Sequence, residues 1–136
     1  MSRKFLLPVV LSGLLLPFAS CQKENAPKPA NAGLTGTWQL TGHQCYCTPA
    51  PLPNEQVRFD AATFAFLRNG QKTLSGTYTE TVDTTFCNRS AVPAIRFQPD
   101  SGAARPVQFT LRGNTLTLDY GSPCDAPLDT YQRVAQ

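Results

Sequence analysis

The sequence has little charge, one histidine and no helical periodicity. Asp, Glu, Lys and Arg make up 15% of the 136 residues, against roughly 25% in an average soluble protein, which argues against long salt-bridged helices and coiled coils. A single histidine, His43, limits acid–base catalysis. The absence of a Cys-x-x-Cys motif disfavours dithiol redox catalysis.

The charge balance is also small. The chain carries 12 basic and 9 acidic residues, and two of the basic residues, Arg3 and Lys4, lie in a segment that we expect to be removed. The remaining net charge of +1 indicates neither a nucleic acid nor an acidic protein as a partner. The length suffices for one domain and not for two.

The first 20 residues read as a secretory signal peptide. Arg3 and Lys4 precede the apolar run 5–18, which contains two prolines and is too short to span a bilayer. The following Phe18-Ala19-Ser20-Cys21 resembles a bacterial lipobox. The resemblance implies that Cys21 becomes the acylated N-terminus of the mature protein; the alternative is an ordinary secretory protein with Cys21 free.

Residues 21–32 are predicted to be a flexible tether, because Gln, Lys, Glu, Asn, Ala and Pro leave nothing to bury. Lys23-Glu24, just after Cys21, is similar to the charged surface-export signals of Bacteroidota lipoproteins. We therefore expect a lipid-anchored protein of the bacterial cell envelope, at the outer membrane or the cell surface, that contacts the membrane through its anchor only.

From Gly33 onward the apolar residues recur with period two. The runs 107–112 and 115–120 alternate without error around Gly113-Asn114, a two-residue hairpin signal. Pairing across this turn places Leu111 opposite Leu116 and Phe109 opposite Leu118, so all apolar residues share one face. This agreement specifies the register, because a slip of one residue would turn the whole set outward.

A second hairpin is predicted at Asn69-Gly70. A two-residue loop there pairs Phe66 with Thr73 and mixes the faces, whereas a three-residue loop, 68–70, pairs Phe66 with Lys72 and Phe64 with Leu74. We expect the three-residue loop.

Eight short strands follow from these patterns. The others are predicted at 34–41, 57–59, 76–82, 94–98 and 130–134. An antiparallel sheet of this size with one apolar face removes its edges by closing. The predicted fold of residues 33–136 is therefore all-β, a small eight-stranded antiparallel up-and-down β-barrel, with a β-sandwich as the alternative.

Gly36-Thr37-Trp38 on the first strand and Arg133 on the last resemble the lipocalin pattern, and the domain looks like the short lipocalin-like domains of secreted Bacteroidota lipoproteins. The resemblance implies that Arg133 packs over the Trp38 indole and closes one end of the barrel. It also implies that the other end is open.

Four cysteines remain in the domain: Cys45, Cys47, Cys87 and Cys124. An even number in an exported chain favours disulfides. Since a bond between Cys45 and Cys47 would be strained, we expect either Cys45–Cys87 with Cys47–Cys124, or Cys45–Cys124 with Cys47–Cys87. The alternative is a copper or zinc site at His43-Gln44-Cys45-Tyr46-Cys47; we expect no metal or other cofactor, because thiolates rarely stay reduced outside the cytoplasm.

Two functions are compatible with such a barrel. One is a carrier of a small apolar ligand; the other is a filled barrel that acts through its loops, for example as an extracytoplasmic protease inhibitor or an envelope assembly component. Glu80, which alternation places on the face of Tyr78, is a candidate polar group inside the cavity. We expect a monomer that is not an enzyme, with a ligand site lined by these inward-facing residues: Phe64, Phe66, Leu74, Tyr78, Glu80, Ile95, Phe97, Phe109, Leu111, Leu116 and Leu118.

Overall fold

The computed structural model describes residues 33–85 and 87–134, which belong to a compact unit, Asn31–Gln136. The predicted signal peptide 1–20, the tether 21–32 and the lipidation residue Cys21 lie outside the described residues. Within the described ranges, no helix is long and apolar enough to cross a membrane.

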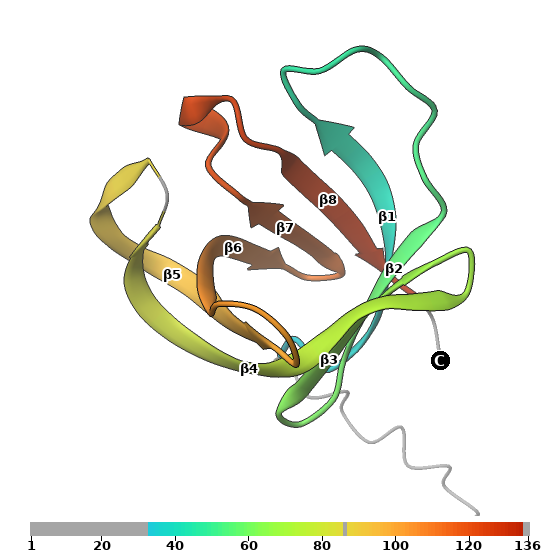
Figure 1. Cartoon of the computed structure of the whole chain (residues 1–136), viewed down its shortest axis with the longest axis horizontal. Coiled ribbons are helices and arrows are strands. Elements are labelled where there is room, and N and C mark those ends of the chain that lie inside the picture. The colour runs from blue at the N-terminus through green and yellow to red at the C-terminus, as the bar shows by residue number, and fades with distance from the viewer. Residues whose placement is uncertain (1–32, 86, 135–136) are drawn as a thin grey trace, which may run out of the picture. The chain divides into compact units, whose positions relative to one another are not determined.

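The described residues form a closed antiparallel barrel in which each strand pairs with the next and β8 pairs with β1 (Figure 1). The predicted eight-stranded up-and-down barrel is confirmed, and the sandwich alternative is wrong. A short 3-10 turn, η1 (Ser122–Cys124), lies between the last two strands. The strands are β1 (Gly36–Gln44), β2 (Glu55–Phe59), β3 (Thr63–Arg68), β4 (Gln71–Thr85), β5 (Asn88–Pro99), β6 (Arg105–Arg112), β7 (Thr115–Asp119) and β8 (Leu128–Arg133).

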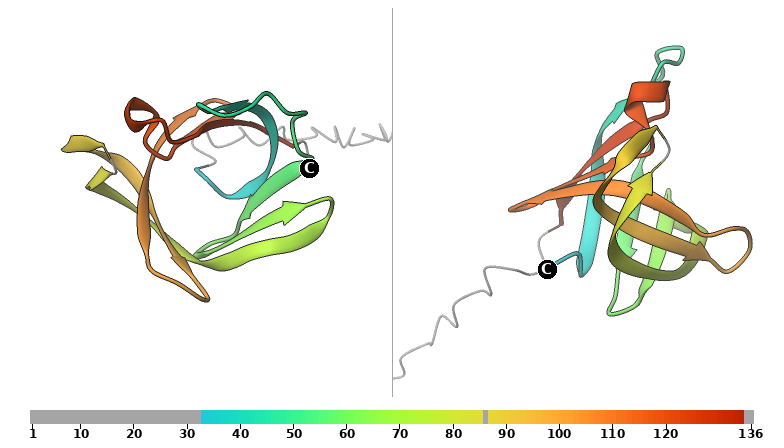
Figure 2. Two further views of the ribbon diagram at one scale, coloured as in Figure 1. Left: turned by 45° about the horizontal axis from the view of Figure 1, so that its top comes forward. Right: turned by 90° about the vertical axis from the view of Figure 1, so that its left-hand side faces the viewer.

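The pairing of β1 with β8 closes the barrel (Figure 2). Trp38 is opposite Arg133 and Leu40 is opposite Tyr131, and the register shifts at a bulge between Leu40 and Gly42. Residues about 90 positions apart are joined here by main-chain hydrogen bonds, so the paired parts of β1 and β8 are not exposed as sheet edges.

The hairpin of β6 and β7 has the predicted register. Leu111 pairs with Leu116 and Phe109 with Leu118 across Gly113-Asn114. Gly113 has a φ of 58°, a conformation that glycine adopts without steric cost.

The predicted register of the hairpin of β3 and β4 is wrong. Arg68 pairs with Gln71, so the loop has two residues, Asn69 and Gly70, both with positive φ. A bulge in β4 then pairs Phe66 with Leu74 instead of Lys72, and Phe64 with Gly76 instead of Leu74. Asn-Gly suits a two-residue turn, so the extra residue is accommodated inside the strand and not in the loop.

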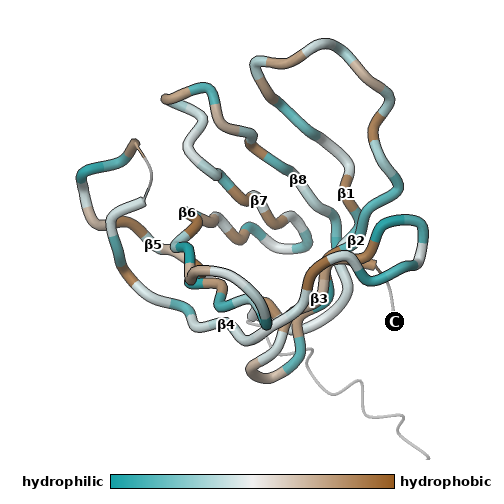
Figure 3. The backbone as a smooth tube through the Cα atoms, in the orientation of Figure 1, coloured by the Kyte–Doolittle hydropathy of each residue, from teal (hydrophilic) through white to brown (hydrophobic). Residues whose placement is uncertain are grey.

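The interior of the barrel is filled with apolar side chains, and hydrophobic positions alternate with hydrophilic ones along the strands (Figure 3). Ring–ring contacts join Phe59, Phe64, Phe66 and Phe97, with centroid distances of 4.8–6.1 Å. The fully buried large side chains are Trp38, Tyr131, Phe59, Leu34, Ile95, Leu116, Leu118 and Val57.

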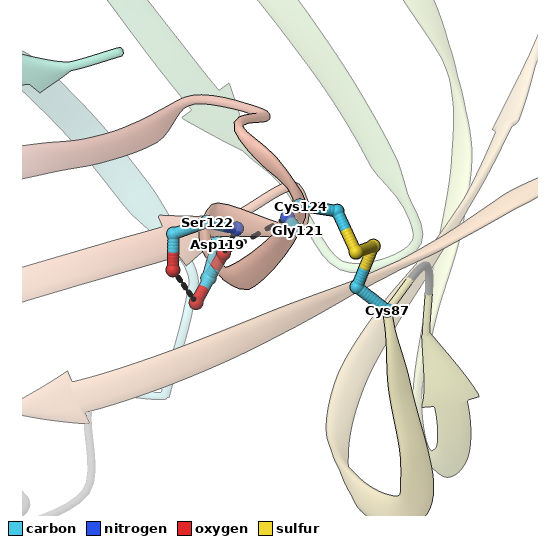
Figure 4. Close-up of a disulfide and its surroundings, with 5 residues drawn as sticks. All are labelled: Cys87, Asp119, Gly121, Ser122 and Cys124. Carbon is cyan, nitrogen blue, oxygen red and sulfur yellow. Dashed lines mark hydrogen bonds between the residues drawn. A yellow bond between two sulfur atoms is a disulfide. The ribbon is translucent and has the colours of Figure 1, made fainter. Parts of the chain in front are cut away.

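The four cysteines form two disulfides, but neither predicted connectivity is correct. Cys45 bonds to Cys47, with Cα atoms 5.2 Å apart, and Cys87 bonds to Cys124, with Cα atoms 5.9 Å apart. Both separations lie within the range that a disulfide bridges, so one intervening residue does not prevent the short bond. The second disulfide ties the tip of the long β4–β5 hairpin to η1 (Figure 4).

Candidate functional site

One end of the barrel is closed by Trp38 and Arg133. The guanidinium carbon of Arg133 lies 4.0 Å from the centroid of the Trp38 ring, as the sequence pattern predicts. Arg133 also donates hydrogen bonds of 2.6 Å and 2.8 Å to the carbonyls of Thr35 and Gly33, and the Trp38 indole donates to the Leu34 carbonyl at 2.8 Å. The stack therefore fastens the entry of β1 to the end of β8.

Gly36 permits this close approach. A Cβ at this position would lie 2.8 Å from Nη1 of Arg133, and its φ of +131° is one that other residues rarely adopt. The backbone conformation is therefore what requires glycine in Gly36-Thr37-Trp38, and the absent Cβ also leaves room for the Arg133 guanidinium.

A cavity of about 380 Å³ is bordered by residues of β2 to β6 and by Tyr120, which follows β7. Its wall contains neither Trp38 nor Arg133. The volume is in the range of pockets that hold small molecules. Its lining residues are Glu55, Phe66, Thr73, Leu74, Phe97, Pro99, Ser101, Gly102, Ala103, Arg105, Val107 and Tyr120.

Glu55 is the one acidic residue in the cavity wall. Its side chain is largely buried and both carboxylate oxygens accept hydrogen bonds, from the Tyr131 hydroxyl at 3.1 Å and from Nη2 of Arg68 at 2.9 Å. The carboxylate is therefore held in place by two partners while it faces an otherwise mainly apolar space.

Buried hydroxyls and a second carboxylate surround Glu55. Burial raises the pKa of Tyr131 and of Tyr120, and the charges of Glu55 and Asp129 raise both further. Burial also raises the pKa of Asp129; a hydrogen bond from His43 opposes this effect and the charge of Glu55 adds to it. Both tyrosines are consequently neutral hydrogen-bonding groups, and Tyr120 is one of the residues that line the cavity.

Only three of the predicted lining residues, Phe66, Leu74 and Phe97, border the cavity. Four others are buried in the core, and three pack against it while partly buried. The buried ones are Phe64, Ile95, Leu116 and Leu118, and the partly buried ones are Tyr78, Phe109 and Leu111.

The prediction that Glu80 is a polar group inside the cavity is wrong. Glu80 pairs with Ile95, so it does lie on the predicted face, but its side chain is exposed. The reason is the length of the hairpin: β4 and β5 remain paired as far as Thr85 and Asn88, whereas β3 pairs with β4 only as far as Thr77. Glu80 lies beyond the end of β3, which leaves its side chain exposed.

A second hollow, of about 680 Å³, lies under the loop between β1 and β2. It contains His43, Cys45 and Cys47, whose potential ligand atoms all lie within 4.8 Å of one another. Nδ1 of His43 is 2.5 Å from Oδ1 of Asp129. The two sulfurs are bonded to each other here, so in this oxidised state they do not offer thiolates to a metal.

The candidate-site residues that the sequence did not predict are Glu55, Tyr120 and Asp129. A signal for Glu55 was present, because Glu55, Val57 and Phe59 alternate along one strand and the last two are buried. Asp129, Tyr131 and Arg133 form a similar series in β8. The predicted strand at 57–59 began too late to include the glutamate.

Comparison of the chain with protein-family models, with curated proteins and with solved structures finds no match.

Proposed function

We propose that this protein is a lipid-anchored, lipocalin-like protein of the bacterial cell envelope that binds a small, mainly apolar ligand at the open end of its barrel. The observation that carries the proposal is the cavity of about 380 Å³, whose wall contains neither Trp38 nor Arg133. Acylation of Cys21, which the lipobox resemblance implies, would hold the barrel at the membrane through the tether 21–32.

The side chains of the cavity wall support one class of ligand. Phe66, Phe97 and Val107 offer apolar contact, and Glu55 accepts hydrogen bonds from its fixed position. A molecule with an apolar body and one hydroxyl or amine donor satisfies both features, because an apolar pocket with few oriented polar groups binds such ligands selectively.

The alternative is the filled barrel that acts through its loops. This alternative is supported by the large side chains that fill other parts of the interior, among them Trp38, Tyr131 and Phe59, each fully buried. A binding experiment directed at the cavity wall separates the two functions.

The test uses the full-length chain and the neutral apolar amine N-phenyl-1-naphthylamine, whose emission rises in an apolar site. Ala103→Trp places a large side chain at the cavity rim, and Ala61→Trp is the matched control, because both alanines are exposed loop residues and only Ala103 lines the cavity. We expect saturable binding to the wild type and to Ala61→Trp, and at least tenfold weaker binding to Ala103→Trp.

Native mass spectrometry of the protein purified from its own host extends the test to the natural ligand. A small molecule that co-purifies with the wild type and not with Ala103→Trp supports the carrier. Absence of dye binding together with an empty purified protein overturns it and favours the filled-barrel alternative.

A further inference from the structure

The loop between β1 and β2 holds three soft ligands next to a carboxylate that orients one of them. We propose that, once its disulfide is reduced, the cluster of His43, Cys45 and Cys47 binds one Cu(I) ion. This site shares no lining residue with the cavity, so it does not depend on the proposed ligand binding.

The first argument is the arrangement of the ligand atoms. A ring nitrogen of His43 and the sulfurs of Cys45 and Cys47 lie within 4.8 Å of one another. Cys47 and His43 are exposed and Cys45 is half-buried, so an ion can enter from the hollow beneath residues 48–53. No large movement of the chain is needed to bring the three groups around one ion.

The second argument is the carboxylate behind the histidine. Asp129 is 8% exposed, and its Oδ1 lies 2.5 Å from Nδ1 of His43. A carboxylate that accepts a hydrogen bond from Nδ1–H fixes the tautomer and leaves the lone pair of Nε2 for a metal. Such a carboxylate is the usual outer partner of a metal-binding histidine. Asp129 is thus a positioning residue for this site.

The ligand set selects the metal. Two thiolates and one imidazole are soft ligands that suit Cu(I). Structural zinc sites are almost always built from four protein ligands. Among the described residues, the group of His43, Cys45 and Cys47 offers three, which is too few for such a zinc site.

Reduction of the Cys45–Cys47 disulfide is a two-electron thiol–disulfide exchange. A protein dithiol of the thioredoxin class attacks the Cys45–Cys47 bond, becomes a disulfide itself and leaves two thiols on this chain. Cu(I) then displaces the two thiol protons and stays Cu(I) throughout. The exposure of Cys47 gives an attacking thiolate access, so the bond acts as a switch between a closed and a metal-binding state.

The experiment uses the full chain carrying Cys21→Ser, which removes the one cysteine outside the barrel. After anaerobic reduction and removal of the reductant, Cu(I) is titrated in competition with the chromophoric chelator bicinchoninate. We expect one Cu(I) per reduced chain, none on the unreduced chain, and an X-ray absorption spectrum with two sulfur neighbours and one nitrogen neighbour.

Variants separate the site from a general effect of free thiols. Cys47→Ser should abolish competitive binding, and Asp129→Asn should weaken it about 10- to 100-fold, the range found for outer partners of metal ligands. The double variant Cys87→Ser/Cys124→Ser, which removes the other disulfide, is the matched control and should bind as the parent does. Circular dichroism checks that each variant is folded.

Three results would overturn the proposal. They are equal binding by the unreduced chain, loss of binding in the Cys87→Ser/Cys124→Ser control, and tighter retention of Zn²⁺ than of Cu(I) in the same competition format. None of them bears on N-phenyl-1-naphthylamine binding, so the two proposals fail separately.

Discussion

At the scale of single residues, Arg133 links the end of β8 to the start of β1. It stacks on the only tryptophan and donates to two carbonyls that precede β1. Arg133→Ala should lower the free energy of unfolding by about 1–2 kcal/mol and shift the Trp38 emission. Arg133→Lys should recover only part of both, because an ammonium group is not a planar stacking group and cannot match the guanidinium fork. Urea denaturation followed by fluorescence measures both; an unchanged emission and stability in Arg133→Ala would contradict the stack.

Asp119 gives a pH dependence whose sign follows from its contacts. Burial by itself would raise the pKa of Asp119, but hydrogen bonds from the backbone of Ser122 and Gly121 and from the Ser122 hydroxyl outweigh it and lower the pKa below the usual 3.8. The stabilisation is therefore present above pH 3.8 and is lost as the pH falls through the lower, folded-state value. Asp119→Asn should cost up to about 1 kcal/mol at pH 7, given the solvent exposure of the loop, and the difference from the wild type should shrink near pH 2. Asp125→Asn is the control in the same loop, since asparagine tolerates the left-handed backbone there. Urea denaturation at several pH values measures the free energy of unfolding, and a difference between wild type and Asp119→Asn that does not change with pH would contradict the prediction.

At the scale of elements, the two disulfides differ in what they join. Cys87–Cys124 closes 37 positions and fastens the projecting hairpin to η1, whereas Cys45–Cys47 closes two within one loop. The entropy of loop closure then assigns about 4 kcal/mol to the long bond and less than about 2 kcal/mol to the short one. Cys87→Ser/Cys124→Ser should therefore lower the melting temperature more than Cys45→Ser/Cys47→Ser does. Calorimetry of the two double variants measures this, and the reverse order would contradict it.

The two hairpins differ in whether alternation along the sequence predicts their register. The β6–β7 turn has the register predicted from alternation alone, since both faces agree on one pairing. The β3–β4 hairpin does not, because its two-residue Asn69-Gly70 turn leaves the extra residue to a bulge in β4. The bulge brings Gly76 opposite Phe64, and on its other side a Cβ on Gly76 would lie 2.0 Å from the Gln98 carbonyl oxygen of β5, so the close approach of β5 requires a glycine there.

At the scale of the whole molecule, the proposed lipid anchor can be tested separately from the barrel. Intact mass of the membrane-purified protein should show a chain that begins at Cys21 and carries added acyl mass. Cys21→Ser should release the protein from the membrane fraction and leave its melting temperature unchanged, because the composition of residues 21–32 offers little apolar surface to bury. A soluble wild-type product cleaved at another position would remove the anchor from the proposed function.

The strand count and the closure of the sheet could be predicted from the sequence, because period-two alternation is a local constraint that the residues themselves carry. The Trp38–Arg133 contact could be predicted only through the resemblance to the lipocalin pattern, because the two residues are far apart along the chain. Disulfide connectivity and the cavity required the tertiary structure. Which cysteines meet depends on the distance between a hairpin tip and a 3-10 turn that are far apart along the chain. Whether an inward residue such as Ile95 fills the core, or Glu80 reaches solvent, depends on how far the neighbouring strand extends, and alternation along one strand contains no information about that length.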